Sequence, residues 1–527
     1  MGFFSHLCLA FWLFLSLFSL SPGVGAASGP AAIGPNILFI MSDDHAQRAI
    51  SAYGDNLVST PNIDRIADEG AIFRNSFVTN SICTPSRAVL LTGKFSHLNG
   101  VRGNGDVFDS QQATFPQILQ QQGYETAVVG KWHLSSDPTG FDYWQILVGQ
   151  GEYYSPRFLT SAGTVQYSGS YVTDKVTDLV LEFLQNRDKS KPFMMLYHHK
   201  APHRNWMPPV DELDPDNITH IPLPDSFNDD YAGRPAAKEA DMRIADMFLS
   251  YDMKLRSDDY ERETGSGGGR GRKQSVQEAL QAWQDAYARL SPEQKKKWDR
   301  FYNRINAAYQ QVRNDPEALA RWKYQRYLHD YLATVRSVDN NVARVLDYLD
   351  AEGLYADTIV IYTSDQGFYL GEHGWYDKRF MYEESMRTPL LLRYPAAVAA
   401  GQQIDQLIQN LDLAPTLLDF AGVQVPADMQ GLSLKKLVTG KHYGAWRDTL
   451  YYHYYQYPSW HLVNPHYGIR SATHKLIHFY TRERWELYDL EQDPQEMYNR
   501  YNSPTYAQIR TQLHEQLRRL REQYGDT

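Results

Sequence analysis

The run Asn36-Ile37-Leu38-Phe39-Ile40-Met41-Ser42 leads without a break into Asp43-Asp44-His45. An apolar run of this length that stops at charged residues is typical of a strand buried in a parallel sheet. Three further runs, at residues 125–130, 193–197 and 358–364, also stop at residues capable of chemistry. Because ligands gather at the carboxyl ends of strands in open α/β sheets, the four strand ends predict one shared site.

Helical patterns separate these runs, and they occupy residues 61–70, 86–92, 114–123, 174–186 and 327–353. The alternation predicts an α/β fold with a doubly wound, mostly parallel sheet in a catalytic domain of residues 34–425. A charged helical insertion interrupts it at about 226–322, and its composition favours a surface decoration over a lid. The tyrosine-rich remainder, residues 426–527, predicts a smaller C-terminal α+β subdomain.

Residues 1–26 have the pattern of a cleaved signal peptide, with an apolar stretch at 7–20 followed by the small-residue site Val24-Gly25-Ala26. We therefore expect an exported protein, periplasmic or extracellular. No later segment is long and apolar enough to predict a membrane span. Cys8 leaves with the leader, so Cys83 is the one cysteine of the mature chain and has no partner for an internal disulfide.

The net charge of -10 argues against nucleic acid as a partner, because phosphate backbones recruit basic surfaces. The 43% hydrophobic content is ample for a large globular core. An anionic substrate must therefore meet a local basic pocket in this chain.

Oxygen ligands follow two of the predicted strands. Asp43 and Asp44 come after the first strand, and Asp365 and Gln366 come after the last. Three carboxylates and an amide oxygen are the ligands that Ca²⁺ prefers, whereas Mg²⁺ demands tighter octahedral geometry and Zn²⁺ favours nitrogen and sulfur. The pattern predicts a calcium site.

Cationic and proton-carrying side chains accompany these oxygen ligands in an otherwise acidic chain. They are Arg87, Lys131, His133, His203 and Lys378. A tetrahedral oxyanion held at a metal needs such a group of positive charges. Cys83 comes just before a predicted helix, whose first amides could also face the anion.

The run Cys83-Thr84-Pro85-Ser86-Arg87, followed by Leu91-Thr92-Gly93-Lys94, resembles the signature of the formylglycine-dependent type I sulfatases. The resemblance extends over nearly the whole mature chain. It implies an alkaline-phosphatase-like fold, and a maturation enzyme that oxidises Cys83 to Cα-formylglycine. The metal ligands it implies are Asp43, Asp44, Cys83 as formylglycine, Asp365 and Gln366, where relatives often carry Asn in place of Gln366.

The same resemblance implies roles for the catalytic residues. Arg87 would hold the formylglycine hydrate, while Lys131 and Lys378 would bind sulfate oxygens. His133 and His203 would handle protons. Either Lys378 or His203 is expected to act as the general acid that protonates the leaving oxygen.

The substrate is expected to be a sulfated glycan. The chain resembles bacterial N-acetylglucosamine-6-sulfatases and mucin-desulfating sulfatases around residues 198–206, 365–384 and 452–470. This implies a sulfuric ester hydrolase acting on 6-O-sulfated N-acetylglucosamine. The candidate sugar contacts are Trp206, His373, Trp375, His461, His466 and Arg470, and packing roles are equally open for each of them.

Three alternatives stay open. The chain could be a sulfatase acting on another sulfated glycan or on aryl sulfates. It could be a phosphomonoesterase or phosphodiesterase, although a nucleophilic Ser or Thr would then be expected in place of Cys83. It could also be a non-catalytic sulfated-glycan binder with an unmodified Cys83, although no catalytic position is missing.

Overall fold

The computed structural model describes residues 34–213, 219–255, 270–441 and 444–527. The predicted leader, residues 1–26, lies outside these ranges. None of the described helices has both the length and the apolar character that a membrane crossing requires.

The centre of the structure is a ten-stranded sheet. In spatial order its strands are β11 (Gln402–Ile404), β2 (Ala71–Phe73), β10 (Leu390–Arg393), β9 (Thr358–Ser364), β1 (Asn36–Ser42), β8 (Phe193–His198), β4 (Glu125–Gly130), β5 (Tyr143–Leu147), β6 (Arg157–Thr160) and β7 (Gly163–Gln166). The run from β9 to β5 is parallel, and β10, β6 and β7 pair antiparallel with their neighbours. The predicted α/β fold is therefore confirmed, and its four predicted strands are β1, β4, β8 and β9.

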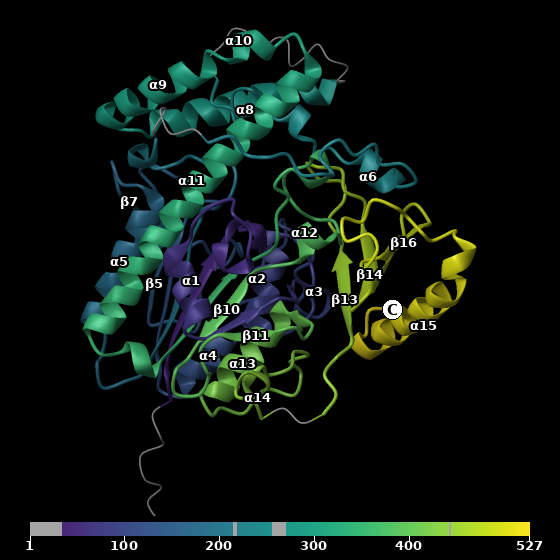
Figure 1. Ribbon diagram of the computed structural model, residues 1–527. Coiled ribbons are helices and arrows are strands. Elements are labelled where there is room, and N and C mark those ends of the chain that lie inside the picture. The colour runs from purple at the N-terminus through teal and green to yellow at the C-terminus, as the bar shows by residue number, and fades with distance from the viewer. Residues whose placement is uncertain (1–33, 214–218, 256–269, 442–443) are drawn as a thin grey trace, which may run out of the picture. The chain divides into compact units, whose positions relative to one another are not determined.

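Both faces of the sheet are covered by helices, because successive side chains of a strand point to opposite sides. Leu38 and Ile40 of β1 belong to a core cluster with α1 (Pro61–Asp68), α5 (Val172–Asn186) and α11 (Pro316–Ala351). Ile37 and Phe39 belong to a second cluster with α2 (Cys83–Thr92), α4 (Phe115–Gln121) and α13 (Leu413–Phe420). Figure 1 shows α5 and α11 running side by side.

Helix α11 begins at Pro316, 11 residues before the predicted start at residue 327. Asp315 caps it by accepting hydrogen bonds from the amides of Glu317 and Ala318, and Pro316 occupies the first turn. The helix therefore reaches back into the segment that we assign to the insertion.

The predicted insertion contains α6 (Pro235–Glu239), α8 (Arg270–Ala288), α9 (Pro292–Asn306) and α10 (Tyr309–Val312), labelled in Figure 1. It is more than a solvated decoration, because Trp283, Trp298 and Tyr302 are buried in the same core cluster as Leu38. The ring of Trp298 meets that of Tyr154 edge-on, with 6.0 Å between their centroids. The expectation of a surface decoration rested on the charge of the insertion and did not take these buried aromatic side chains into account.

The C-terminal subdomain is an antiparallel sheet of β13 (Thr449–Tyr454), β14 (His466–Ser471), β15 (His474–Phe479) and β16 (Arg484–Asp489). Helix α15 (Ala507–Tyr524) packs on this sheet and buries Leu513 and Leu517 (Figure 1). A small antiparallel sheet with a C-terminal helix matches the predicted α+β subdomain.

The strand register brings the four polar strand ends to one level. Ser42 of β1 pairs with Ser364 of β9, Met41 pairs with His198 of β8, and Gly130 of β4 also pairs with His198. The residues that follow these positions therefore leave the sheet along the same edge, as the sequence predicted.

Candidate active site

Three buried carboxylates form the centre of the site. Asp43 and Asp44 follow β1, and Asp365 follows β9. One carboxylate oxygen from each lies within 4.8 Å of the others. Asp44 adopts a left-handed backbone conformation, with φ 66°, and its amide donates to Asp365 Oδ1 at 3.1 Å. Tyr331 of α11 holds this turn by donating to the Asp44 carbonyl at 2.8 Å.

The electrostatics of these carboxylates favour a bound cation. Burial, together with the negative charge of Asp43, raises the pKa of Asp365 to about 7. Burial would raise the pKa of Asp43 as well, but the charges of Lys131 and Arg87 hold it well below its usual range. A divalent cation would relieve the electrostatic repulsion between the carboxylates of Asp365 and Asp43.

Gln366 completes an all-oxygen donor set. Its Oε1 is buried and accepts no hydrogen bond from any residue that the structure describes. Its Nε2 donates to Asp44 Oδ1 at 2.5 Å. A buried amide oxygen without a partner is costly, and a metal ion would satisfy it. The residues present therefore fit a hard cation such as Ca²⁺.

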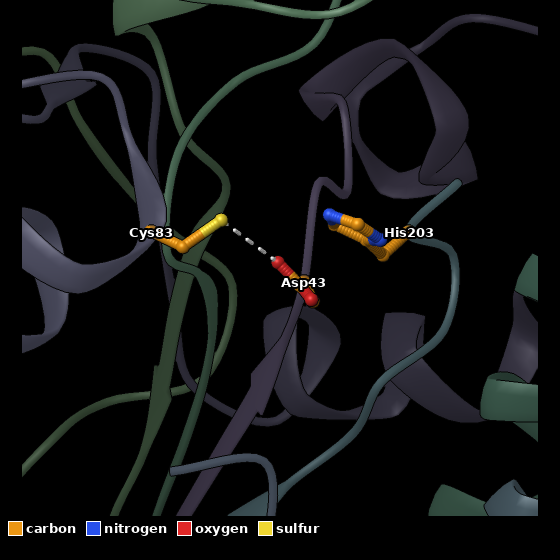
Figure 2. Close-up of side chains that lie close together, drawn as sticks. All are labelled: Asp43, Cys83 and His203. Carbon is orange, nitrogen blue, oxygen red and sulfur yellow. Dashed lines mark hydrogen bonds between the residues drawn. The ribbon is translucent and has the colours of Figure 1, made fainter. Parts of the chain in front are cut away.

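Cys83 is the first residue of α2 and lies against this centre, with 1% of its surface exposed. Its Sγ is 3.6 Å from Asp43 Oδ1 and 3.5 Å from Gln366 Nε2. Figure 2 shows Asp43 between Cys83 and His203. Burial raises the pKa of the Cys83 thiol to about 11, so at neutral pH the unmodified side chain is an uncharged thiol and a poor nucleophile.

Each carboxylate has a cationic partner. Arg87 donates from Nη2 and Nε to Asp365 Oδ2, at 2.9 and 3.1 Å. Lys131 donates to Asp43, and Lys378 donates to both oxygens of Asp44, at 2.6 and 2.7 Å.

These three cations are buried, and two of them are connected to each other. Arg87 Nη1 also donates to the Lys131 carbonyl at 2.7 Å, which ties α2 to the end of β4. Arg87, Lys131 and Lys378 are all nearly inaccessible to solvent. The sequence-predicted cations therefore converge around the Cys83 side chain.

Two histidines flank the centre. His203 Nε2 is 3.7 Å from Asp44 Oδ2, and its Nδ1 donates to the Arg204 carbonyl at 2.6 Å. His133 lies beside Thr84, whose hydroxyl donates to the His133 carbonyl at 2.9 Å. Burial and the charge of Lys131 lower the pKa of His133 to about 2, and burial also lowers the pKa of His203. Both rings are therefore neutral at pH 7, and the positive charge around them opposes protonation unless an anion is bound.

Four of the six predicted sugar contacts lie in the core. Trp206 packs against Tyr327, with 4.6 Å between ring centroids, and Trp375 stacks on Phe380 at 5.0 Å. His373 and His466 are also fully buried. His373 Nδ1 lies 2.7 Å from Asp229 Oδ2, and His466 Nε2 accepts from the Met381 amide at 3.0 Å. These side chains serve packing and hydrogen bonding inside the protein.

The other two candidates differ from each other. Arg470 of β14 pairs with Glu383 at 3.1 Å, and this ion pair joins the C-terminal sheet to the catalytic domain. His461 Nε2 lies 3.1 Å from Asp377 Oδ2, so it reaches the residue that precedes Lys378. Of the six, His461 is the one that the structure brings next to the cationic centre.

Sequence reasoning missed the two neighbours of Lys378. Asp377 and Arg379 both have left-handed backbone conformations, with φ 78° and 102°, and their side chains form an ion pair. Strain of this kind persists only where surrounding contacts enforce it, and it gathers at functional sites. The available signal in the sequence was a pair of oppositely charged residues, one on each side of a lysine predicted to bind sulfate.

Two family models match the chain. The model described as Sulfatase matches residues 35–423, and the one described as N-sulphoglucosamine sulphohydrolase, C-terminal, matches residues 371–523. The N-acetylglucosamine-6-O-sulfatase of Bacteroides thetaiotaomicron is 48% identical over 500 residues, which are 93% of this chain and 87% of that relative.

Solved structures agree with the sequence matches. A protein in complex with its substrate, D-glucosamine-2-N,6-O-disulfate, has a TM-score of 0.87 at 48% identity, over 94% of this chain and 99% of the other. The phosphonate monoester hydrolase of Agrobacterium radiobacter has a TM-score of 0.66 at 19% identity, over 93% of this chain and 96% of the other. The second likeness shows the fold alone.

Proposed function

The chain belongs to the sulfatase family, and from this premise we propose that it releases the 6-O-sulfate of N-acetylglucosamine units in sulfated glycans. It is a sulfuric ester hydrolase by family. The observation that carries the sulfate-ester chemistry is the position of Cys83, buried at the start of α2 among three carboxylates and three cations.

We further propose that Cys83 acts as Cα-formylglycine beside a Ca²⁺ ion. A thiol whose pKa is raised to about 11 is neutral and weakly nucleophilic, which supports prior modification. The partnerless Gln366 Oε1 and the clustered carboxylates support the metal. When present, the hydrated aldehyde supplies a hydroxyl nucleophile and Ca²⁺ supplies positive charge beside it.

The cationic residues bind and orient the sulfate ester. Lys131 and Lys378 have Nζ atoms next to Asp43 and Asp44, so both ammonium groups can donate to sulfate oxygens held over position 83. Arg87 is fixed by Asp365 at 2.9 Å and also approaches Asp43 at 3.9 Å. Fixed positive charge in a buried site stabilises developing negative charge without further reorganisation.

The histidines move protons. Because Nδ1 of His203 donates to the Arg204 carbonyl, its Nε2 is the atom that takes up a proton. The charge of a bound sulfate ester raises the basicity of this nitrogen, so that it can carry the proton that the leaving oxygen needs. His133, neutral and beside Thr84, is placed to accept a proton on the side of α2.

The sugar specificity is proposed from similarity and position together. The relative with 48% identity is a 6-O-sulfatase of N-acetylglucosamine. Asp377 and Arg379 flank Lys378 with strained backbones and an ion pair, and His461 contacts Asp377. We assign these three side chains to sugar hydroxyls because they lie next to the sulfate-binding lysine. The leader pattern of residues 1–26 supports export to the periplasm or outside the cell, and a formylglycine-generating enzyme must act on Cys83 there or before export.

Release of inorganic sulfate from positional isomers tests the proposal. Matured protein should release sulfate from N-acetylglucosamine-6-sulfate and leave the 3-sulfate isomer intact, and it should prefer sulfate to phosphate at the 6 position. Turnover of aryl sulfates with no release from the 6-sulfated sugar would overturn the substrate. Faster turnover of the 6-phosphate would favour a phosphoesterase.

A further inference from the structure

A cavity of about 300 Å³ lies beside His203, and none of the three clustered carboxylates lines it. One wall is the loop at residues 150–154 together with the loop that follows β8. The other wall is helix α8 of the insertion, which contributes Ala282 and Asp285, together with Arg289 directly after the helix. The volume is at the lower end of the range for small-molecule pockets.

Lys200 lines this cavity with 4% of its surface exposed. Its Nζ donates to the Gln150 carbonyl at 3.2 Å and lies 4.8 Å from the centroid of the Tyr153 ring. An ammonium group has three N–H donors, and one hydrogen bond leaves donors unused. Among the described residues no carboxylate lies within ion-pairing distance of Lys200.

The other cations of the cavity already have carboxylate partners. Arg289 pairs with Glu152 at 2.9 Å, and Glu152 also pairs with Arg157 at 2.6 Å. Arg204 pairs with Asp252 at 2.6 Å. Asp285 stands exposed on α8 at the cavity edge. A buried and uncompensated charge is expensive, so the retention of Lys200 without a carboxylate points to a negatively charged ligand.

The position of Lys200 connects the cavity to the reaction. The amide of His203 donates to the Lys200 carbonyl at 3.0 Å, so the two residues share one turn. The Tyr153 hydroxyl, on the same wall, donates to the His203 carbonyl at 2.6 Å. Burial lowers the pKa of Lys200 to about 8, and a bound anion would hold the ammonium form. A substrate whose leaving oxygen meets His203 can extend into this space.

We propose that the cavity is a second anion subsite, in which Lys200 binds a negatively charged substituent other than the sulfate that is cleaved. The proposal rests on the function proposed above. An N-sulfate on the same glucosamine and the carboxylate of an adjacent uronic acid have the required chemistry. Charge-assisted hydrogen bonds from a buried ammonium to either group are the strong class. The insertion, through α8, then acts as a wall of the substrate site.

The test compares substrates with one and two anions. The sugars are N-acetylglucosamine-6-sulfate, glucosamine-2-N,6-O-disulfate, and a disaccharide of uronic acid with 6-sulfated N-acetylglucosamine. For Lys200→Met, kcat/KM on the substrate whose second anion occupies the subsite should fall at least tenfold more than on N-acetylglucosamine-6-sulfate, mainly through KM. Lys200→Arg should restore the preference. Whether the disulfate or the uronate substrate responds identifies the source of the anion.

Lys189→Met is the matched control, because Lys189 is exposed and pairs at 3.5 Å with Glu352 away from the cavity. An equal proportional loss on all three substrates, or no loss on either two-anion substrate, would overturn the subsite. If wild-type protein released sulfate from none of them, the proposed function would fail instead. Calorimetric binding of glucosamine-2-N,6-O-disulfate and of the uronate disaccharide to Cys83→Ala protein, with and without Lys200→Met, then decides the subsite on its own. Equal affinities of both proteins for both sugars would contradict it.

Discussion

The catalytic centre balances three buried carboxylates against three buried cations, one for each carboxylate. Asp43 is paired with Lys131, Asp44 with Lys378, and Asp365 with Arg87. A divalent cation and a sulfate ester would add positive and negative charge to the same centre. With a divalent cation beside the carboxylates, the two lysines would be able to turn from the carboxylates toward sulfate oxygens.

Replacement of Lys378 tests its role as a sulfate ligand. Lys378→Ala should lower kcat by about 10²–10³-fold, because the loss of one donor to a developing oxyanion has about this effect in comparable sites. The measurement is sulfate release at saturating substrate, beside a melting curve. Lys189→Ala is the exposed control. Full activity of a folded Lys378→Ala protein would remove this residue from the mechanism.

Replacement of Gln366 tests the metal site. Gln366→Leu removes the partnerless amide oxygen while it keeps the size of the side chain, so calcium affinity should fall by about tenfold or more. Gln366→Asn keeps an amide oxygen and should retain more affinity. Titration calorimetry on chelator-treated protein measures both. Unchanged affinity in Gln366→Leu would exclude Gln366 from the coordination sphere.

The strand ends were predictable from sequence because a parallel sheet has simple geometry. Apolar runs that stop at Asp43, Lys131 and Asp365 must end at one edge if their strands are adjacent and parallel. No comparable rule predicts the direction in which a loop side chain points. Trp206 and Trp375 follow predicted site residues in sequence, yet the packing of Tyr327 and Phe380 turns them into the core. That packing depends on partners distant in sequence.

Helix α11 joins the insertion to the catalytic domain through a buried charge pair. Lys254 Nζ donates to Asp330 Oδ2 at 2.7 Å, and the Tyr302 hydroxyl of α9 donates to the same carboxylate at 3.1 Å. Both Lys254 and Asp330 are fully buried. Breaking such a pair leaves an uncompensated charge inside the protein.

We predict that Asp330→Asn lowers the free energy of unfolding by about 3–5 kcal/mol at pH 7, because Lys254 loses its partner. Burial opposes ionisation of Asp330, but Lys254 and Arg326 outweigh it and hold its pKa below the usual range. The stabilisation is therefore present above the unfolded-state pKa of about 3.9 and is lost as pH falls below it. Denaturant unfolding at pH 7 and pH 3 should show a smaller difference between the proteins at low pH. A pH-independent difference would contradict this.

The two parts of the fold meet at the substrate side of the centre. His461 belongs to the connection between β13 and β14, and its contact with Asp377 brings the C-terminal subdomain beside Lys378. Lys475 of β15 pairs at 3.0 Å with Glu383, which follows Lys378 closely in the sequence. The C-terminal subdomain is thus part of the sugar-binding site that we propose.

Replacement of His461 tests whether the C-terminal subdomain contributes to sugar binding. A hydrogen bond between neutral groups contributes about 0.5–1.5 kcal/mol, so His461→Ala should lower kcat/KM on N-acetylglucosamine-6-sulfate by about two- to tenfold. His474→Ala, on the same subdomain but paired with Asp489 at 3.9 Å, is the control. Loss of kcat/KM without an increase in KM would show that His461 does not hold the sugar.

The central claim concerns Cys83, a buried thiol that is neutral at working pH and is surrounded by what a sulfate ester needs. The most direct measurement is the mass of the peptide that contains Cys83, in preparations of different specific activity. The account predicts that the fraction of this peptide carrying formylglycine rises in proportion to sulfate release from N-acetylglucosamine-6-sulfate. Full activity in protein whose Cys83 is entirely an unmodified thiol would contradict it.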